Sequence, residues 1–577
     1  MYAPERLSLG LGLGALLASL ALVHPLALVG GALVGVFRLP FLLGFILVFF
    51  RSLLFPLPLP PSGPLEAEGV VQRGILHTSS GAVHVNPPLE DGVYHLKGRI
   101  VPPAPPRLPG GLDEQTWLLG QGIRAVFKVE TVLEQTPVPD GREVFRTRLR
   151  DGLSPRVARM MEALTLGEKR GLGDYAAFQE SGLAHLLALS GLHVGLLAAF
   201  FVLLLFPLGP SRYLLALLGL LLYLGLVGPN PSLLRATLMA GLSLLGLFFG
   251  LGRSSLLSAL GVAFFFQMLL SPWTIFSLSL QLSYLATLGL ALGLPALPKA
   301  KGGLGVVQGA FWTTLSAQAL ALPFLLHHFH LLPLLSPLAN LLALPLVGVL
   351  VPLGFLKLLL GDLLAPVVEP LARLLLALTH LFAQGPQLVW GEISFAGFAL
   401  YYLGLLPLGL ALYRKLSWEK ALLLTSLPLA FSLLSAWPKP VEALRLGQDA
   451  FFFRLGQREV LFLMGREDPE GVARALKALG VGALEVLVAE EGPARILQRA
   501  LPVGRVIHPG REALDLSTGG LRLEVRKDGW TLFFSGYTAR GAFKEGPVEI
   551  AGKGRTWSLP PGLKEAASLR LALGYAW

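Results

Sequence analysis

Residues 181–195 read Ser-Gly-Leu-Ala-His-Leu-Leu-Ala-Leu-Ser-Gly-Leu-His-Val-Gly, and they open a nearly uninterrupted hydrophobic stretch from Leu183 to Trp437. A transmembrane helix needs about 20 consecutive apolar residues to cross the bilayer core. The stretch therefore predicts about ten membrane-spanning helices, separated where Pro, Gly and charged residues gather. These breaks lie near residues 207–212, 228–231, 250–254, 271–272, 295–303, 331–336, 352–362, 385–395 and 414–419.

The composition of the whole chain agrees with a membrane protein. Hydrophobic residues make up 53% of the 577 residues and charged residues only 14%, against about 25% charged in soluble domains. The net charge of +11 indicates either an anionic partner such as nucleic acid or the Lys/Arg anchors of a cytoplasmic membrane surface. The chain has no cysteine, which excludes disulfides, thiolate nucleophiles, iron–sulfur clusters and Cys-ligated zinc.

Two segments precede the long hydrophobic stretch. Residues 1–61 predict two or three N-terminal transmembrane helices, which brings the total to about 10–13 spans. Leu7–Val23 resembles a signal peptide, but the apolar pattern resumes at once, which favours a retained anchor. Residues 62–153 alternate short β-type runs with turns rich in Pro and Gly, which predicts a small all-β soluble domain. A five-stranded Greek-key barrel is the simplest fold for a segment of this length, and a sandwich is the alternative. The runs are Gly69–Ile75, Val93–Val101, Gly122–Val132 and Glu143–Leu149.

Two further segments complete the domain organisation. Residues 154–182 predict amphipathic connecting helices, and residues 438–577 predict a C-terminal αβ soluble domain. The expected strands of that domain are Ala450–Leu455, Val460–Met464, Leu484–Ala489, Leu521–Val525 and Thr531–Ser535, with a helix at Pro469–Leu479. An even number of spans between the two soluble segments would place both on one side of the membrane. With Arg6 taken as cytoplasmic and three spans before Leu65, that side is the outer one.

Polar residues within the spans are the first candidates for function, because each costs about 2.5 to 3.5 kcal/mol at mid-helix. On one continuous helix, His185 and His193 would lie about 80° apart, with Ser190 three residues before His193. Three interpretations compete. Ser190 and His193 could form a nucleophile–base pair, the histidines could bind zinc with a third ligand from His327, His328 or His330, or the residues could line a helix–helix contact.

A second polar feature follows the break at Gly228-Pro-Asn-Pro231. Asn-Pro-Ser is typical of a helix start and would place Arg235 in the first turn, where the helix dipole disfavours a cation. Arg235 therefore needs a compensating feature: either it snorkels to the interface or pairs with a carboxylate, or it faces an anion such as a passing phosphate. Further polar side chains recur later in the stretch at Gln281, Ser283, Gln318 and Asn340.

These residues together resemble the ComEC family of competence proteins. Residues 181–195 are close to the family's "sGLaHLLAiSGLHVG" pattern, and other family blocks follow in order. They are Pro231-Ser232 with Leu234-Arg235-Ala236, Gln281-Leu282-Ser283, Ser316-Ala317-Gln318 with Pro323, and Asn340-Leu341 with Pro345. The β domain resembles the family's OB-like domain more weakly, through Leu112-Asp113, Trp117-Leu118 and Gly122-Ile123.

The resemblance implies a channel, residues 183–437, that translocates single-stranded DNA across the cell (inner) membrane during natural transformation. The expected DNA pathway contains His185, Ser190, His193, Arg235, Gln281, Ser283, Gln318 and Asn340. The implied partners are single-stranded DNA, membrane lipid, an external competence DNA receptor, a cytoplasmic DNA helicase or translocase and single-strand-binding proteins. Motive force must come from such a partner, because no Gly-x-x-x-x-Gly-Lys-Ser/Thr loop is present.

The C-terminal segment departs from the family pattern. The family often ends in a metallo-β-lactamase-like nuclease domain with a "DVGQGDA" opening and an "HxHxDH" metal cluster. Here the opening reads Leu444-Arg-Leu-Gly-Gln-Asp-Ala450, and Leu487–Pro493 contains no histidine. His508 remains as an isolated histidine. Without the other ligands a binuclear metal site cannot form, so the domain is expected to be degenerate, without metal, cofactor or nuclease activity.

Two functions of other classes stay open on the residues alone. An intramembrane hydrolase would use Ser190 and His193, although no orienting carboxylate follows them. A small-molecule transporter would also suit a polytopic membrane protein. The sequence shows no internal repeat or inverted symmetry of the kind on which many transporters are built.

Overall fold

The computed structural model describes residues 63–559 with short gaps, together with residues 11–13, 15–16, 43–44, 46–49 and 51. The gaps are residues 79–80, 107, 112, 139–140, 253, 298–301, 392, 435–440, 447–449, 456–457, 464–466, 509–513, 519–520, 527–528, 535–536, 543–547 and 553–554. Most of the predicted N-terminal spans, and the Gly447–Asp449 motif, lie outside the described residues. The chain divides into two compact units, one of residues 1–104, 114–322 and 333–386, the other of residues 105–113, 323–332 and 387–577.

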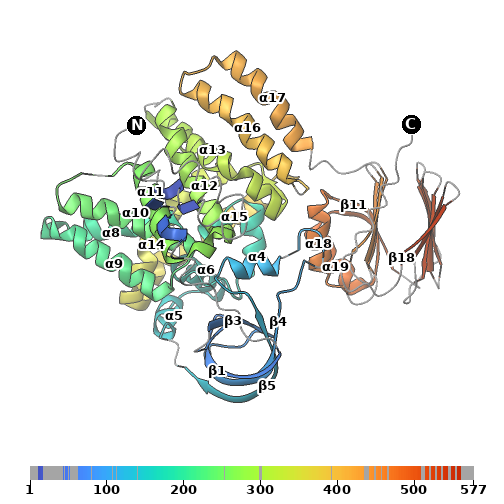
Figure 1. Cartoon of the computed structure of the whole chain (residues 1–577), viewed down its shortest axis with the longest axis horizontal. Helices are drawn as coiled ribbons and strands as arrows, with labels where there is room; N and C mark the ends of the chain where they lie inside the picture. Colours follow the sequence, from blue (N-terminus) through green and yellow to red (C-terminus); the bar gives the residue numbers. More distant parts are fainter. Residues whose placement is uncertain are drawn as a thin grey trace. The chain divides into compact units, whose positions relative to one another are not determined.

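The first soluble segment is a closed five-stranded barrel (Figure 1). Its strands are β1 (Gly63–Gln72), β2 (Ile75–Thr78), β3 (Gly81–Asn86), β4 (Gly92–Val101) and β5 (Val126–Pro137), in the order β1-β2-β3-β5-β4. Val71, Leu76, Leu96 and Phe127 are buried in the barrel core. The short helix α4 (Glu114–Leu119) joins β4 to β5.

The predicted strand at Glu143–Leu149 is wrong, because these residues form helix α5 (Glu143–Arg150). Glu143 lies in its first turn and Arg148 and Arg150 in its last, an arrangement that matches the helix dipole. Seven residues of mixed polar and apolar character fit a short strand and a short amphipathic helix equally well. The charge order, which was the distinguishing signal, favours the helix.

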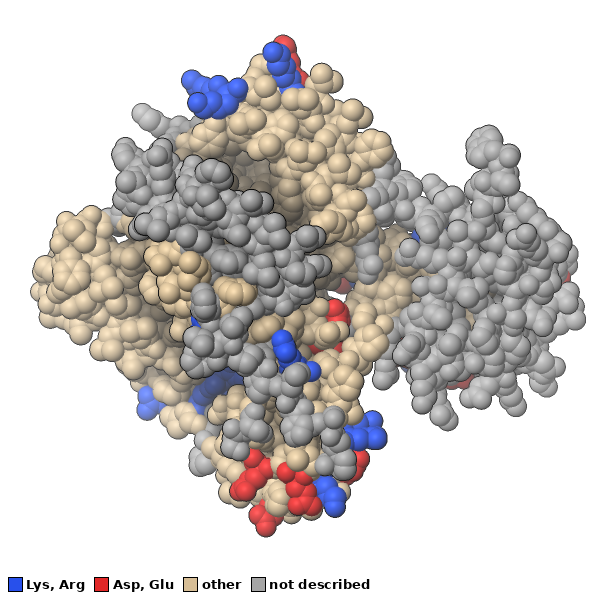
Figure 2. All heavy atoms as spheres, in the orientation of Figure 1, with Lys and Arg blue, Asp and Glu red and all other residues tan. Residues whose placement is uncertain are grey.

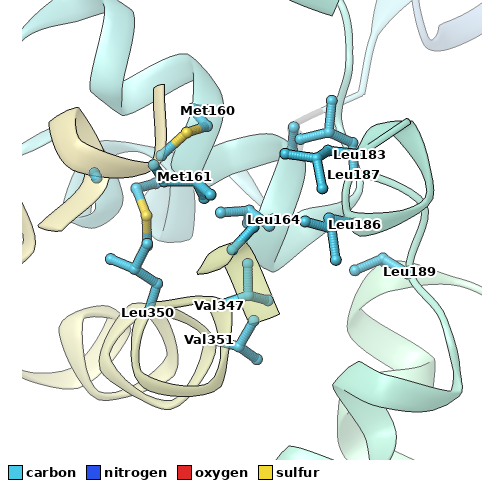
Figure 3. Packing of buried hydrophobic residues seen from close by; sticks show 14 of the residues in the cluster. Met160, Met161, Leu164, Leu183, Leu186, Leu187, Leu189, Val347, Leu350 and Val351 are labelled. Atoms are coloured by element: carbon cyan, nitrogen blue, oxygen red, sulfur yellow. The ribbon is translucent and has the colours of Figure 1, made fainter. Parts of the chain in front are cut away.

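The connecting segment contains α6 (Pro155–Leu166) and α7 (Tyr175–Glu180). Pro155 occupies the first position of α6, and Gly167 ends the helix with a φ of 75°, as is usual at the two ends of a helix. Figure 3 shows the side chain of Met161 pointing toward Leu350 and that of Leu164 toward Val347 and Val351. The absence of a side chain at Gly354 allows this approach, since a Cβ there would lie 2.9 Å from Met161 Cε.

Ion pairs hold the connecting helices together. Arg146 donates to both carboxylate oxygens of Glu168, at 2.7 and 2.8 Å. Arg156 Nε donates to Asp174 at 2.8 Å, and His380 Nε2 lies 2.8 Å from the same carboxylate. The hydrogen bond from Arg156 lowers the pKa of Asp174 below its ordinary value, and His380 lowers it further. Asp174 is therefore a carboxylate whose charge the folded state stabilises.

The hydrophobic stretch forms the helices α8 to α17. They are α8 (Gly191–Leu204), α9 (Ser211–Val227), α10 (Pro231–Phe248), α11 (Leu256–Leu270), α12 (Leu278–Gly293), α13 (Gly302–Phe329), α14 (Ser336–Leu360), α15 (Ala365–Ala383), α16 (Phe395–Leu412) and α17 (Trp418–Leu434). α14 continues through Pro345 and Pro352 to Leu360, beyond the start of the predicted break, because transmembrane helices tolerate proline.

Several of these helices are long and apolar enough to cross a membrane, which is consistent with the membrane-protein prediction. Within the described residues, five helical segments are long and apolar enough, and three more apolar helices are shorter. The five are Pro231–Phe248, Leu278–Ala296, Val307–Phe329, Ser336–Ala383 and Phe395–Leu412. On the face drawn in Figure 2, charged side chains are few over these helices and gather over the barrel.

The second unit contains the C-terminal αβ domain. A five-stranded sheet in the order β12-β11-β10-β9-β8 carries α18 (Pro469–Ala478) and α19 (Glu491–Ala500) in its connections. Its strands are β8 (Val441–Arg445), β9 (Ala450–Leu455), β10 (Arg458–Leu463), β11 (Leu484–Ala489) and β12 (Val503–Ile507). A second, antiparallel sheet comprises β13 (Leu514–Thr518), β14 (Leu521–Arg526), β15 (Gly529–Phe534), β16 (Tyr537–Ala542), β17 (Val548–Gly552) and β18 (Arg555–Leu559). The predicted strands and the helix at Pro469 are present.

The closest helix crossing yields a stability prediction. A Cβ at Gly289 of α12 would overlap the carbonyl oxygen of Ser316 on α13, whereas a Cβ at Gly225 of α9 would meet nothing within 4 Å. We expect Gly289→Ala to lower the free energy of unfolding by about 1 to 3 kcal/mol, and Gly225→Ala to leave it unchanged or slightly higher. Unfolding in SDS, followed by tryptophan fluorescence, measures both; equal stabilities would contradict the close crossing.

The Asp174 ion pair predicts a pH dependence. A carboxylate whose pKa is lowered on folding contributes stability above its unfolded pKa of about 3.9, and loses that contribution as the pH falls through the folded pKa. We therefore expect Asp174→Asn to cost about 1 kcal/mol at pH 7 and the difference from wild type to shrink as the pH is lowered to about 3. Thermal unfolding in detergent at both pH values is the measurement. Glu130→Gln, which removes an exposed carboxylate 3.6 Å from Arg99, is the control and should show little effect at either pH.

Candidate functional site

The segment 181–195 is not one helix. Gly182 turns the chain with a φ of 78°, and Ala184–Leu186 forms the single 3-10 turn η1, in which His185 Nδ1 lies 3.0 Å from the Gly182 carbonyl oxygen. Ser190 is extended, and α8 begins only at Gly191. The prediction that His185 and His193 share one helix face is therefore wrong, because a helix start lies between them.

Ser190 and His193 form the start of α8. They make a reciprocal capping box, in which His193 Nδ1 accepts the Ser190 backbone N–H at 3.3 Å. Because Nδ1 is the acceptor, the proton of the neutral ring is on Nε2. The side chain is fully buried, and Nε2 has no hydrogen-bond partner in the described part of the chain. His193 thus presents a buried, unused N–H donor.

This geometry bears on the hydrolase and zinc interpretations. Ser190 Oγ lies 3.3 Å from His193 Nδ1, but the same nitrogen caps the helix, and no described carboxylate hydrogen-bonds to the ring. No group of three His, Asp or Glu side chains among the described residues is arranged to hold a metal. His327 instead directs Nδ1 at the Ile393 carbonyl oxygen, 3.1 Å away. The arrangement favours a capped helix start.

Arg235 lies directly against the start of α8. Asn230 caps α10 by accepting the Leu233 N–H at 3.0 Å, as predicted, and Arg235 is the fifth residue of the helix, just beyond the expected first turn. A Cβ on Gly191 would lie 2.9 Å from Arg235 Nη2. The glycine of the Ser-Gly-Leu-His sequence therefore makes room for a guanidinium.

Arg235 is buried without a carboxylate. The residue is 5% exposed, and its Nη1 donates to Thr287 Oγ1 and contacts Met239 Sδ at 3.8 Å. Its guanidinium lies 5.7 Å from the ring centre of Tyr284. No described Asp or Glu forms an ion pair with it, so the carboxylate interpretation of Arg235 fails. Nε has no hydrogen-bond partner within the described residues, which makes it a second unused buried donor.

Helix α12 completes this group. Ser232 and Ser283 hydroxyls are 2.7 Å apart, and Arg235 reaches Thr287, so α10 and α12 run in the same direction. We call Ser190, His193, Ser232, Arg235, Ser283, Tyr284 and Thr287 the polar cluster. It lies near the starts of α8 and α10, where helix dipoles present partial positive charge, and against the second and third turns of α12.

The other predicted site residues lie elsewhere. Gln318 Nε2 donates to Ser336 Oγ at 3.3 Å, and Gly182 packs against the Ser336 side chain. Asn340, one turn further along α14, is 6% exposed, and its Oδ1 has no partner among the described residues. Gln281 donates to the nearby Ile275 carbonyl oxygen at 2.9 Å, which is a local structural role. The eight predicted residues therefore do not form one group.

Thr287 and Gln267 were missed by the sequence analysis. Gln267 Nε2 donates to the Pro231 carbonyl oxygen at 3.1 Å and its Oε1 accepts from the Tyr284 hydroxyl at 2.9 Å. Thr287 follows Ser283 by four residues, a spacing that places both on one helix face. That periodicity was an available signal. The position of Gln267 depends on tertiary packing and had no comparable signal.

Comparison with known proteins matches residues 164–415 to the competence protein family. The chain is 32% identical over 263 residues to ComE operon protein 3 of Bacillus subtilis, covering 43% of this chain and 33% of that protein. It is 30% identical over 271 residues to competence protein ComA of Neisseria gonorrhoeae, covering 43% and 38%. The chain thus spans only about a third of the length of the first relative and 38% of the second. No solved structure matches the chain.

The contact between Gly191 and Arg235 can be tested by substitution. We expect Gly191→Ala to destabilise the protein by about 1 to 3 kcal/mol, because its Cβ must displace the guanidinium. Gly195→Ala on the same helix, where a Cβ meets nothing within 4 Å, is the matched control. In the Arg235→Ala background, Gly191→Ala should become much less costly. A double-mutant cycle by thermal unfolding measures this coupling; additive effects would show that the two residues do not touch.

Proposed function

Because the chain contains a membrane domain of the ComEC family of competence proteins, we propose that it forms a conduit that carries single-stranded DNA across the cell membrane during natural transformation. The observation that carries this proposal is a pair of buried donors, His193 Nε2 and Arg235 Nε, near the starts of α8 and α10; neither has a hydrogen-bond partner among the described residues. A buried donor without a partner costs about 1 to 3 kcal/mol. A phosphate passing the polar cluster would satisfy both.

The chemistry of the cluster suits a strand that must keep moving. A conduit has to bind weakly at many points, because a tight site would arrest the strand. One arginine surrounded by hydroxyls supplies a single strong contact, and helix starts add partial charges that attract phosphate. Gln318 and Asn340 would extend the polar route on the side of Gly182. His185, which is exposed beside that turn, would add a third polar side chain to this part of the route.

The barrel would guide the strand, although not through an aromatic platform. Tyr94 and Phe127, two of its few aromatic residues, are 2% and 0% exposed and belong to the core. Trp117 on α4 is 42% exposed, with its ring 5.3 Å from that of His84. Stacking on successive bases requires several exposed rings. Without such rings, two roles are left for an OB-like guide: contact with the DNA backbone, or a purely structural role in which the barrel positions other parts of the protein.

The C-terminal domain is proposed to lack nuclease activity. The position after β11 that would open a metal cluster holds Glu490 and Glu491 and no histidine. His508, which follows β12, directs Nδ1 at the Ala489 carbonyl oxygen, 2.9 Å away. That contact gives His508 a structural role. A purified full-length protein that bound metal and degraded DNA would overturn this part of the proposal.

The remaining parts of the proposal concern location and partners. The soluble domains are proposed to face outward from the cell (inner) membrane, with an external receptor delivering DNA. A cytoplasmic helicase or translocase would supply the motive force and single-strand-binding proteins would receive the strand. The support is the family and the absence of a nucleotide-binding loop from the sequence.

Uptake of labelled DNA by cells tests the conduit. We expect Arg235→Met to reduce uptake by about 100-fold or more, and Arg235→Lys to reduce it less, because lysine keeps the charge but not the planar set of donors. His193→Ala should also reduce uptake, whereas Arg99→Ala on the outer barrel face is the control. Wild-type uptake with Arg235→Met inserted at normal level would overturn the proposal, and labelling of Ser190 by a fluorophosphonate probe would favour the hydrolase.

A further inference from the structure

The turn between β1 and β2 carries an unexpected residue. Gln72 pairs with Ile75, so the hairpin turn consists of Arg73 and Gly74 alone, with φ values of 53° and 79°. A two-residue turn with both φ values positive favours Asn-Gly or Gly-Gly, and a long side chain rarely adopts this conformation. The hairpin itself gives no reason for an arginine. A contact made by the guanidinium can provide one.

That contact is with the hydrophobic helices α8 to α17, here called the membrane block. Arg73 Nη2 donates to the carbonyl oxygen of Val227, the last residue of α9. The following Gly228 has a φ of 89°, and a Cβ there would lie 3.2 Å from Arg73 Nη1. The end of a helix carries partial negative charge and unpaired carbonyl groups, which attract a cationic donor. The Arg73 backbone N–H donates to Asp91 at 2.7 Å, which fixes the turn to the barrel.

A second contact is made near the start of α12 by the segment that joins β4 to β5. Gly120, just after α4, lies so close to the start of α12 that a Cβ would be 2.9 Å from the Ser277 nitrogen. Arg124 packs over the ring of Trp273, 4.9 Å from its centre, in the 3-10 turn η3 (Pro272–Phe276). The two contacts thus involve the segment immediately before α10 and the segment immediately before α12. Both helices contribute residues to the polar cluster.

The outer face of the barrel supports a positioning role. Figure 2 shows acidic side chains gathered over the barrel, and β1, β4 and β5 carry Glu66, Glu68, Glu130 and Glu134 beside Lys97, Arg99 and Lys128. Several of these charges are already paired, such as Glu66 with Lys97 at 3.8 Å and Arg99 with Glu130 at 3.6 Å. A face with paired charges and an excess of carboxylates does not attract a polyanion.

We propose that Arg73 is a positioning residue that docks the barrel onto the end of α9 and thereby fixes the barrel beside the helix starts of the polar cluster. Its significance for transport rests on the proposed function, whereas the docking itself does not. In this proposal Arg73 does not contact the transported DNA; it acts by fixing the position of the barrel. The same contact also fixes the Gly228-Pro-Asn break, from which α10 and Arg235 continue.

The experiment measures the position of the barrel directly. The chain has no cysteine, so spin labels can be attached at Glu68→Cys on the barrel and Arg170→Cys after α6, both exposed, in the full-length protein in lipid nanodiscs. We expect a single narrow distance distribution for the wild-type background. Arg73→Asn, which the turn should accept better than arginine, is expected to lose the narrow peak. Arg99→Asn, which removes an arginine from the outer barrel face, is the control and should retain it.

A second variant tests the docking from the membrane side. Gly228→Ala leaves the barrel sequence intact and should broaden the distribution in the same way, so the test does not depend on the folding of Arg73→Asn. A narrow distribution in both variants would overturn the docking. Uptake of labelled DNA separates docking from transport: we expect about a tenfold loss in Arg73→Asn. Broad distance distributions together with wild-type uptake would overturn the role of docking in transport. If instead Arg235→Met took up DNA like the wild type, the conduit proposal would fail, but the distance measurement would still test the docking.

Discussion

The arrangement of the membrane block depends on a buried guanidinium that has no counter-charge among the described residues. Arg235 fits because Gly191 has no side chain and because Thr287 and Tyr284 supply a hydroxyl and an aromatic face. Removing a cation from water without an anion is expensive unless its surroundings are polar. The cost explains why three helices converge at this point with their polar side chains, and why the starts of α8 and α10 lie so close together.

The sequence predicted much of the architecture because its signals were local. The strand runs Ala450–Leu455 and Leu484–Ala489 are present to the residue, since apolar β-branched and aromatic runs between turns are short-range patterns. The helix start at Asn230 followed from its cap and Pro231. The breaks between hydrophobic helices were also predictable, because proline, glycine and charged residues interrupt a span wherever the chain folds.

The failures occurred where one local pattern suits two structures. Continuous hydrophobicity through Leu183–Leu189 concealed a 3-10 turn and an extended residue, so His185 and His193 were assigned to one helix. Glu143–Leu149 has a composition that fits a strand, but its charge order fits a helix. The grouping of Ser283 with Arg235, and the separation of Gln318 and Asn340 from them, depend on helix packing, for which a single sequence carries no signal.

The capping residue of α8 has a consequence for charge balance. A reciprocal cap usually employs glutamate or glutamine at the position that His193 occupies. Glutamate would place a permanent anion within the same group of residues as Arg235 and would compete with any incoming ligand for its guanidinium. An imidazole closes the helix end equally well while remaining neutral, and it turns a proton toward the interior. The choice of cap thus keeps the polar cluster electropositive without adding a second cation.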